Sequence, residues 1–243
     1  MPIIKLNAID STNSYLKKLC TNKEVENNTV VVAKSQTQGR GQMGTNWQVE
    51  VGKNLTFSTF KQLQKFNVDH QFFISIAVSL GIIKTLEQFG LPKLHVKWPN
   101  DILSEEKKIC GILIENVIKN QELVATIIGV GLNVNQTQFK NLPRASSLKI
   151  ITGTLFDLDE LLHHILKNID YYFEDILNKS HESLLQSYEK LLFRKDKPST
   201  FKSVEGEMFS GYIKGVEDSG KLKVLLEDEV IKSFSMKQIE LLY

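Results

Sequence analysis

A cation, an amide and a carboxylate fall within five residues in the segment KWPND, residues 97–101. Lys97 could neutralise phosphate, and Asn100 and Asp101 offer the oxygen ligands that Mg²⁺ prefers. Pro99 favours an extended backbone in the residue before it, so we expect this cluster at the end of a strand. A β-turn explains the same residues, because Asn and Asp are common turn formers. The spacing alone leaves both interpretations open.

A second candidate begins a strand-like run at KKICG, residues 107–111. Lys108 could polarise a carboxylate that attacks an α-phosphate and stabilise the charge of the transition state. Gly111 would allow a ligand to approach the strand closely. The alternative is a solvated lysine pair at a hairpin. Cys110 could be a nucleophile, but its apolar flanks favour a small buried residue.

The segment GRGQMG, residues 39–44, matches the pattern GxGxxG. A dinucleotide-binding fold would start a helix here and place an acidic residue about 20 positions further on. Trp47 and a strand-like run follow instead. We therefore expect a loop whose backbone amides and Arg40 close over an anion, with a plain surface loop as the alternative.

Two shorter segments are ambiguous when taken alone. Ser11, Thr12 and Asn13 could line a ligand site or only cap a helix. In GVGLNV, residues 129–134, the glycines and Asn133 could line a ligand at a strand end. A strand that merely leaves the sheet would look the same.

The elements that must position these residues follow from hydrophobic periodicity. Helical spacing of apolar residues predicts a helix over residues 73–86, which Gly90 and Pro92 end. The remaining expected strands cover residues 3–6, 29–33, 55–60, 94–98, 109–117 and 123–130, and further helices cover residues 11–19, 159–177 and 182–193.

After residue 197 the pattern changes to short strands separated by turns at 205–206, 218–220 and 228–229. The expected class is α+β, with a mixed-sheet catalytic domain over residues 1–195 and a small β-barrel over residues 196–243.

The bulk composition excludes several classes of protein. The 243 residues carry a net charge of +2, which gives no electrostatic reason to expect binding to nucleic acid or to a membrane. Two cysteines, Cys20 and Cys110, form no CxxC pair, so neither a disulfide framework nor a zinc site is expected. No signal peptide or membrane-spanning stretch is evident, and a cytoplasmic location is the expectation.

Taken together, the segments resemble the biotin–protein ligase family. The matching segments are DSTN, SQTQGRGQMGTNW, KWPND, KKICGILIE and GVGLNVN, in the family's order and spacing over nearly the whole chain. The resemblance implies the biotin/lipoate ligase type of catalytic domain and an SH3-like C-terminal barrel. Because DSTN begins at residue 10, the resemblance is to the ligase-only type without an N-terminal DNA-binding domain.

The resemblance also assigns residues to ligands. Biotin is expected at a set of hydroxyl, amide, glycine and cationic residues: Ser11, Thr12, Asn13, Gln36, Gly39, Arg40, Gly41, Gln42, Lys108 and Gly111. ATP or the adenylate is expected at Trp47, Lys97, Asn100, Gly131 and Asn133, and Mg²⁺ at Asn100 and Asp101. Lys108 and Arg40 are the expected catalytic residues. Many members have a second arginine where this chain has Gln42, which cannot offset charge.

The implied reaction joins biotin to ATP, giving biotinyl-5'-AMP, and then transfers biotin to a lysine. The expected partner is a biotin carboxyl carrier protein or the biotinyl domain of a carboxylase. A lipoate ligase or octanoyltransferase on the related fold, and a non-catalytic biotinyl-adenylate-binding module, are the alternatives. Neither the oligomeric state nor the acceptor follows from the sequence.

Overall fold

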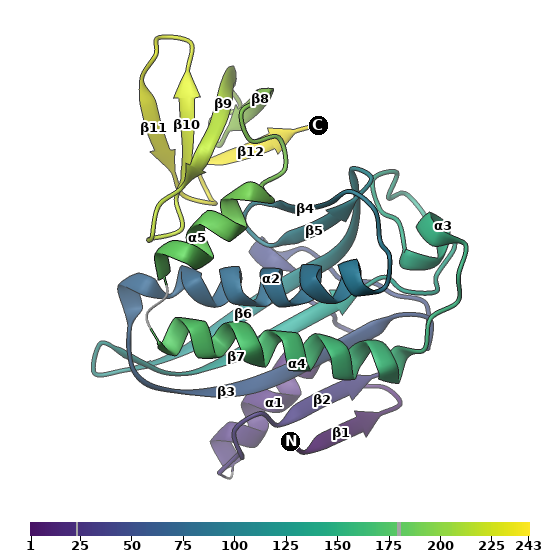
Figure 1. Ribbon diagram of the computed structural model, residues 1–243. Coiled ribbons are helices and arrows are strands. Elements are labelled where there is room, and N and C mark those ends of the chain that lie inside the picture. The colour runs from purple at the N-terminus through teal and green to yellow at the C-terminus, as the bar shows by residue number, and fades with distance from the viewer. Residues whose placement is uncertain (23, 179–180) are drawn as a thin grey trace.

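The chain forms two sheets joined by helices (Figure 1). The structure is a computed structural model that describes residues 1–22, 24–178 and 181–243. The main sheet has seven strands in the order β1-β2-β3-β7-β6-β5-β4. Strands β1 and β2 are parallel and the other neighbours are antiparallel, which confirms the prediction of a mixed sheet. Its strands are β1 (Ile3–Leu6), β2 (Val30–Ala33), β3 (Leu55–Asn67), β4 (Leu94–Lys97), β5 (Asp101–Ser104), β6 (Lys107–Lys119) and β7 (Glu122–Leu132).

Helices cover the two faces of this sheet unequally. α2 (Phe72–Gln88) and α4 (Leu158–Leu177) pack together on one face and α5 (His181–Lys190) packs beside α2 (Figure 1). α2 is apolar almost all round, and Gly90 follows it with a φ of +76°, as the glycine-proline stop predicts. α1 (Thr12–Asn22) lies on the opposite face against β2, β3 and β7. There it covers a small core of its own, formed by Leu16, Val25, Val31, Phe60, Ala125 and Ile127.

Several elements differ from the sequence prediction. β5 and α3 (Leu148–Thr152) were not predicted, because each is only four or five residues long and has no clear period. β3 and β6 are each 13 residues long, since their ends extend past the apolar runs that predicted them. Short 3-10 helices, η1 (Gln42–Gly44) and η2 (Val68–His70), interrupt two connections.

The second sheet has five antiparallel strands in the order β11-β10-β9-β8-β12. They are β8 (Pro198–Ser203), β9 (Met208–Val216), β10 (Leu222–Leu226), β11 (Ile231–Phe234) and β12 (Ile239–Leu242), and the predicted turns fall between them. No hydrogen-bonded ladder among the described residues joins β11 to β12, so the predicted barrel is a sheet that does not close. Phe201, Phe209 and Phe234 stack in sequence along its inner face.

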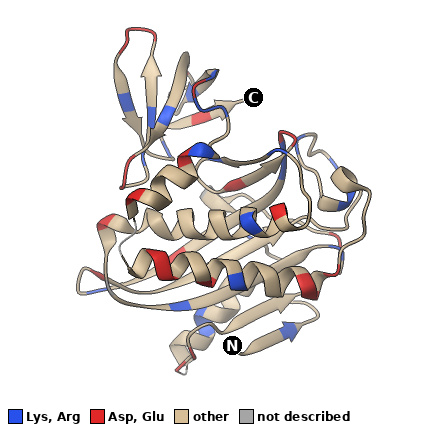
Figure 2. Ribbon diagram, in the orientation of Figure 1, with Lys and Arg blue, Asp and Glu red and all other residues tan. Residues whose placement is uncertain are grey.

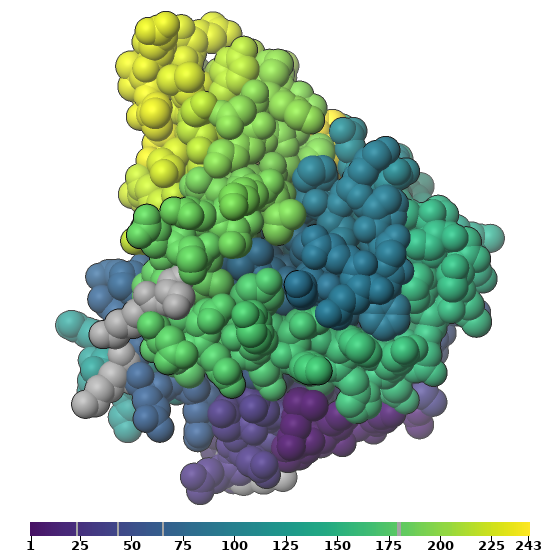
Figure 3. All heavy atoms as spheres, viewed as in Figure 1, coloured from purple at the N-terminus to yellow at the C-terminus, as the bar shows by residue number. Residues whose placement is uncertain are grey.

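The second sheet is seated firmly on the first part of the chain. The indole Nε1 of Trp98 donates to the carbonyl of Gly220 at 2.9 Å, which ties β4 to the β9–β10 turn. Gly220 has a φ of +87°, and a Cβ there would lie 2.6 Å from the ring of Phe72. The turn therefore requires glycine both for its backbone and for its close approach to α2. Figure 3 shows the C-terminal strands (yellow) resting against the α5 segment (green).

Charge is dispersed over the fold. The outer side of α4 is mainly acidic, with Lys167 as its one lysine, and basic and acidic residues recur in both sheets (Figure 2). No helix among the described residues is long and apolar enough to cross a membrane.

Candidate active site

A cavity of about 1030 Å³ lies on the α1 side of the main sheet, next to the second sheet. It is large enough for more than one small molecule. Nearly all the site residues predicted from the sequence line it: Ser11, Thr12, Asn13, Gln36, Arg40, Gly41, Gln42, Trp47, Lys97, Asn100, Asp101, Lys108, Gly111, Gly131 and Asn133. Gly39 does not line the cavity. Its backbone carbonyl accepts from the amide of Trp47 at 2.9 Å, so it shapes the loop instead.

Hydroxyl and amide groups cluster at the α1 end of the cavity. Gln36 Oε1 accepts from the backbone amide of Thr12 at 2.8 Å and from its hydroxyl at 3.0 Å. Ser58 Oγ lies 2.7 Å from Thr12 Oγ1 and 2.5 Å from Asn13 Oδ1. Asn13 Nδ2 donates to Glu115 at 2.8 Å. Thr12 and Asn13 are themselves buried, and these partners hold them in fixed rotamers, so this end is a preformed polar surface.

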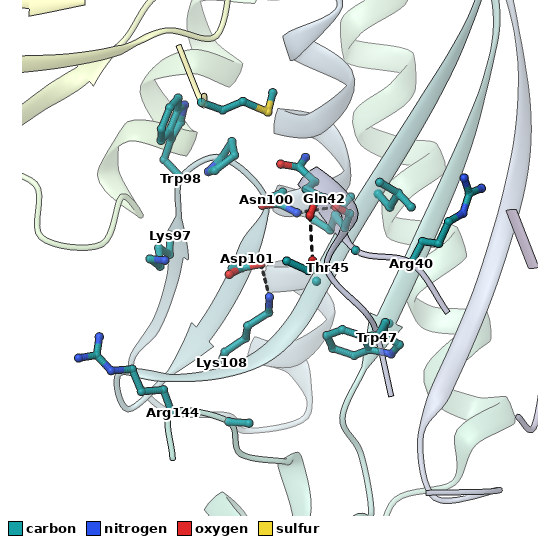
Figure 4. A pocket seen from close by; sticks show the side chains of 18 of the residues that line it. Arg40, Gln42, Thr45, Trp47, Lys97, Trp98, Asn100, Asp101, Lys108 and Arg144 are labelled. Atoms are coloured by element: carbon teal, nitrogen blue, oxygen red, sulfur yellow. Dashed lines mark hydrogen bonds and ion pairs between the residues drawn. The ribbon is translucent and has the colours of Figure 1, made fainter. Parts of the chain in front are cut away.

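Arg40 lies at this same polar end and is directed away from Lys108 (Figure 4). Its guanidinium donates to Ser14 Oγ at 3.1 Å and pairs with Glu115 Oε2 at 3.3 Å. Its loop is ordered by local bonds: the amide of Gly41 donates to the carbonyl of Thr45 at 2.6 Å, and residues 40 and 46 form an antiparallel bridge. No helix of a dinucleotide fold begins here, because only the short η1 follows, as the sequence predicted.

The indole of Trp47 lies flat against the strands that form the floor of the cavity. A Cβ on Gly131 would lie 2.3 Å from the Trp47 ring, and one on Gly111 would lie 3.2 Å from it. Gly111 and Gly131 are paired across β6 and β7, so two glycines side by side create the space for one aromatic ring. Trp47 Nε1 is buried against β7 and has no hydrogen-bond partner among the described residues.

Lys108 is at the centre of the cavity, where its Nζ is 2.7 Å from Asp101 Oδ1 (Figure 4). The ladder places Asp101 of β5 opposite Gly111 of β6, and the Lys108 side chain extends along β6 to within 3.6 Å of a Cβ built on Gly111, which brings its ammonium to Asp101. Burial lowers the pKa of Lys97, and the nearby cations of Lys108 and Arg144 lower it further, against the opposing effect of Asp101. Positive charge is therefore concentrated at this end.

The side-chain amides of two predicted site residues donate hydrogen bonds to backbone carbonyls. Asn100 Nδ2 donates to the carbonyl of Ile112 at 2.7 Å, and Asn133 Nδ2 donates to the carbonyl of Ser146 at 3.0 Å. Their side-chain oxygens stay available to a ligand or cation. Within the described parts of the chain, no group of three His, Cys, Asp or Glu residues could hold a metal ion by itself.

Cys110 is fully buried in the main core, on the side of the sheet away from the cavity. Burial raises the pKa of its thiol strongly, so the thiolate is not populated at neutral pH. The interpretation of Cys110 as a small core residue is confirmed.

Sequence reasoning missed several lining or supporting residues: Ser14, Ser58, Glu115, Arg144 and Tyr243. Ser58 and Glu115 are in strands whose pattern signals burial, and only the three-dimensional register places them near Asn13. Arg144 lies in the loop between β7 and α3 and Tyr243 follows β12, so both reach the site from remote parts of the chain. No local motif could have identified them.

The fold and cavity define an α+β protein whose sheet carries one large site, polar at one end and cationic at the other. The model of the biotin/lipoate A/B protein ligase family matches residues 6–133. The bifunctional ligase/repressor BirA of Bacillus spizizenii is 29% identical over 248 residues, covering 98% of this chain and 74% of that protein. A biotin–[acetyl-CoA-carboxylase] ligase of Mycobacterium tuberculosis is 28% identical over 163 residues, covering 66% of this chain and 59% of that protein.

Solved structures agree with the sequence comparisons. Biotin protein ligase from Aquifex aeolicus, in complex with biotin and ATP, has a TM-score of 0.83 and 28% identity, covering 99% of this chain and 98% of that chain. The chain described above belongs to the biotin/lipoate A/B protein ligase family.

Proposed function

We propose that this chain is an ATP-dependent biotin–protein ligase. It forms biotinyl-5'-AMP from biotin and ATP and transfers biotin to a lysine of a carrier protein. The observation that carries the proposal is the cavity itself: apart from Gly39, the residues that the family resemblance assigns to biotin and to ATP line one continuous space with Lys108 between them. The likeness to the Aquifex aeolicus ligase with biotin and ATP supports it over the whole chain.

Biotin's ureido ring fits the polar end of the cavity. Thr12, Asn13 and Gln36 provide hydroxyl and amide groups that match the ring's donors and acceptor, with Ser11 beside them. The carboxylate then extends toward Lys108, whose ammonium offsets its charge and that of the α-phosphate. Gly41 and Gln42 cover this path from the loop, and Gly111 gives it room.

The nucleotide fits the other half of the cavity. Trp47 offers a ring face, while Gly131 and Asn133 form the floor near it. Lys97 lies toward the phosphates. The carboxylate oxygen of biotin attacks the α-phosphorus, the bond to the β-phosphate breaks, and pyrophosphate leaves with the electron pair. Positioning and charge neutralisation supply the catalysis.

Mg²⁺ would enter with ATP and be held by Asp101 and Asn100. Mg²⁺ is commonly bound by one or two carboxylates together with substrate phosphates, and the donor set here fits that pattern. The metal would supply further neutralisation of phosphate charge. Asp101 also pairs with Lys108, so its carboxylate would be shared between the two cations.

The acceptor is proposed to be a biotin carboxyl carrier protein, in line with the carboxylase ligase of Mycobacterium tuberculosis. We assign residues 1–195 to the catalytic domain and residues 196–243 to the C-terminal domain. The amide of Asp196 already donates to the carbonyl of Ile213 in β9 at 2.9 Å, which supports a boundary at that point.

The test is incubation of the purified chain with ATP, labelled biotin and an isolated carrier domain. Stable labelling of the carrier that requires ATP is expected, and a carrier with its acceptor lysine changed to arginine is the control. Labelling by lipoate or octanoate in preference to biotin would establish the related ligase activity instead. Tight binding of added biotinyl-5'-AMP with neither adenylate formation nor transfer would show a non-catalytic binding module.

A further inference from the structure

Two cations at the phosphate end of the cavity lie against one aromatic ring from the second sheet. Lys97 Nζ is 4.9 Å from the centroid of the Tyr243 ring, and the guanidinium carbon of Arg144 is 4.2 Å from it. The ring is held from behind by Phe193, whose centroid is 5.1 Å away in an edge contact. All three groups at the mouth of the cavity thus have defined positions relative to each other.

Backbone pairing brings Arg144 to this place. The amide of Lys108 donates to the carbonyl of Arg144 at 2.7 Å, and the amide of Ser146 donates to the carbonyl of Lys108 at 2.9 Å. The segment around Arg144 therefore runs alongside β6 like a short extra strand. Figure 4 shows Lys97, Lys108 and Arg144 on the same side of the pocket, with Arg40 on the other.

The charges at this end do not balance. Lys108 is paired with Asp101, but neither Lys97 nor Arg144 forms an ion pair or hydrogen bond with a carboxylate anywhere in residues 1–22, 24–178 and 181–243. Glu240 is the other acidic residue that influences Lys97, and it is exposed. Two cations held close together without a carboxylate of their own favour a multiply charged anion.

We propose that Arg144 and Lys97, positioned on the ring of Tyr243, form the subsite for the β- and γ-phosphates of ATP and for the departing pyrophosphate. The inference rests on the proposed ligase function and extends it to Arg144 as a binding residue and Tyr243 as a positioning residue. Through Tyr243 the C-terminal sheet contributes to adenylate formation without touching biotin.

Attack on the α-phosphorus of ATP creates a need for positive charge at this end of the cavity. When the α-phosphorus is attacked, the electron pair of the broken bond stays on the β-phosphate oxygen, and pyrophosphate carries the added charge. A guanidinium can pair with two phosphate oxygens in a fixed geometry and stays charged at every working pH. Because these contacts exist both before and after the bond breaks, they act mainly on ATP binding and on pyrophosphate affinity.

The experiment compares Arg144→Ala and Tyr243→Ala with wild type in biotin-dependent exchange of pyrophosphate into ATP. We expect KM for ATP and the inhibition constant of inorganic pyrophosphate each to rise about tenfold, with KM for biotin unchanged. Tyr243→Phe keeps the ring and should behave as wild type, and Arg144→Lys should recover part of the loss. Lys140→Ala removes an exposed cation from the same loop outside the cavity and is the matched control.

The possible results distinguish failure of the proposed phosphate subsite from failure of the proposed ligase function. An active wild type whose Arg144→Ala and Tyr243→Ala variants keep both constants within twofold overturns the subsite. Equal rises in KM for ATP and for biotin would show a general structural role and also overturn it. Should Tyr243→Ala unfold, as measured by thermal denaturation, the exposed Arg144→Ala still decides the question. Absence of biotin-dependent exchange in wild type contradicts the proposed function itself.

Discussion

Gly131→Ala should disable the nucleotide half of the site through a single methyl group. The added Cβ would lie 2.3 Å from the Trp47 ring, and ordinary contact begins at 3.4 Å, so the shortfall is about 1.1 Å. The strand cannot yield, because β7 is bonded on both sides to β3 and β6. Trp47 must therefore leave the floor of the cavity.

A misplacement of about 1 Å in a catalytic site can reduce the rate by a factor of about 100. We expect a loss of this size in kcat/KM for ATP, measured by pyrophosphate exchange. A second readout is the emission of Trp47 in a Trp98→Phe background, since these are the two tryptophans in the chain. The emission should shift to the red as the indole moves from the strand surface toward water.

Gly111→Ala is the matched control. Its Cβ would lie 3.2 Å from the same ring, so a shift of about 0.2 Å suffices and the loss should stay below about tenfold. The reasoning is refuted if a folded Gly131→Ala variant keeps kcat/KM for ATP within twofold of wild type. It is also refuted if both alanine variants lose activity equally.

Four further predictions address other residues. Lys108→Ala should slow pyrophosphate release about a hundredfold, equivalent to ~3 kcal/mol of electrostatic stabilisation, and a folded variant with a near-normal rate would exclude that role. Cys110→Ala should keep ligase activity and lose about 1 kcal/mol of unfolding free energy in a denaturant titration, whereas abolished transfer would indicate an acyl-enzyme route. Gln42→Arg should slow the dissociation of biotinyl-AMP and Arg40→Gly should speed it, as followed by stopped flow and by labelling of an unrelated protein; unchanged retention in Arg40→Gly would contradict a role in sealing the site. Because burial lowers the pKa of Lys97, KM for ATP should rise with pH as that ammonium loses its proton below the ordinary lysine pKa. Lys97→Arg should flatten this profile, and a profile identical to that of wild type would assign the titration to another group.

Much of the fold could be predicted because its elements have strong local signals. α2 has a helical apolar period and a glycine stop, and the turns of the second sheet contain Gly206 and Gly220 with positive φ. β5 and α3 could not be predicted, since each is too short for a period to emerge. Whether the second sheet closes into a barrel depends on how strongly its strands curve, and no local sequence pattern encodes this curvature.

The residues of the candidate site, like the elements of the fold, could be predicted only where a short segment of sequence carries the signal. Lys97, Asp101 and Lys108 were found because their residue types suggest chemistry within short segments. That Lys108 pairs with Asp101 depends on the register of β5 and β6, which the sequence does not specify. Arg144 and Tyr243 reach the cavity only through tertiary packing, so the site as a whole is a property of the fold.

The separate small core under α1 would link the proposed biotin recognition to local folding. α1 carries Thr12 and Asn13, but it rests on its own cluster around Leu16 and Phe60 and not on the large core beneath α2. An element with so little apolar burial can open without the rest of the domain. A ligand that binds only the closed form stabilises it by about 2.7 kcal/mol at a concentration 100 times its Kd. Biotin would thus act as part of the helix's own packing, and a change at Leu16, one turn further along the same buried face of α1, would alter the affinity for biotin.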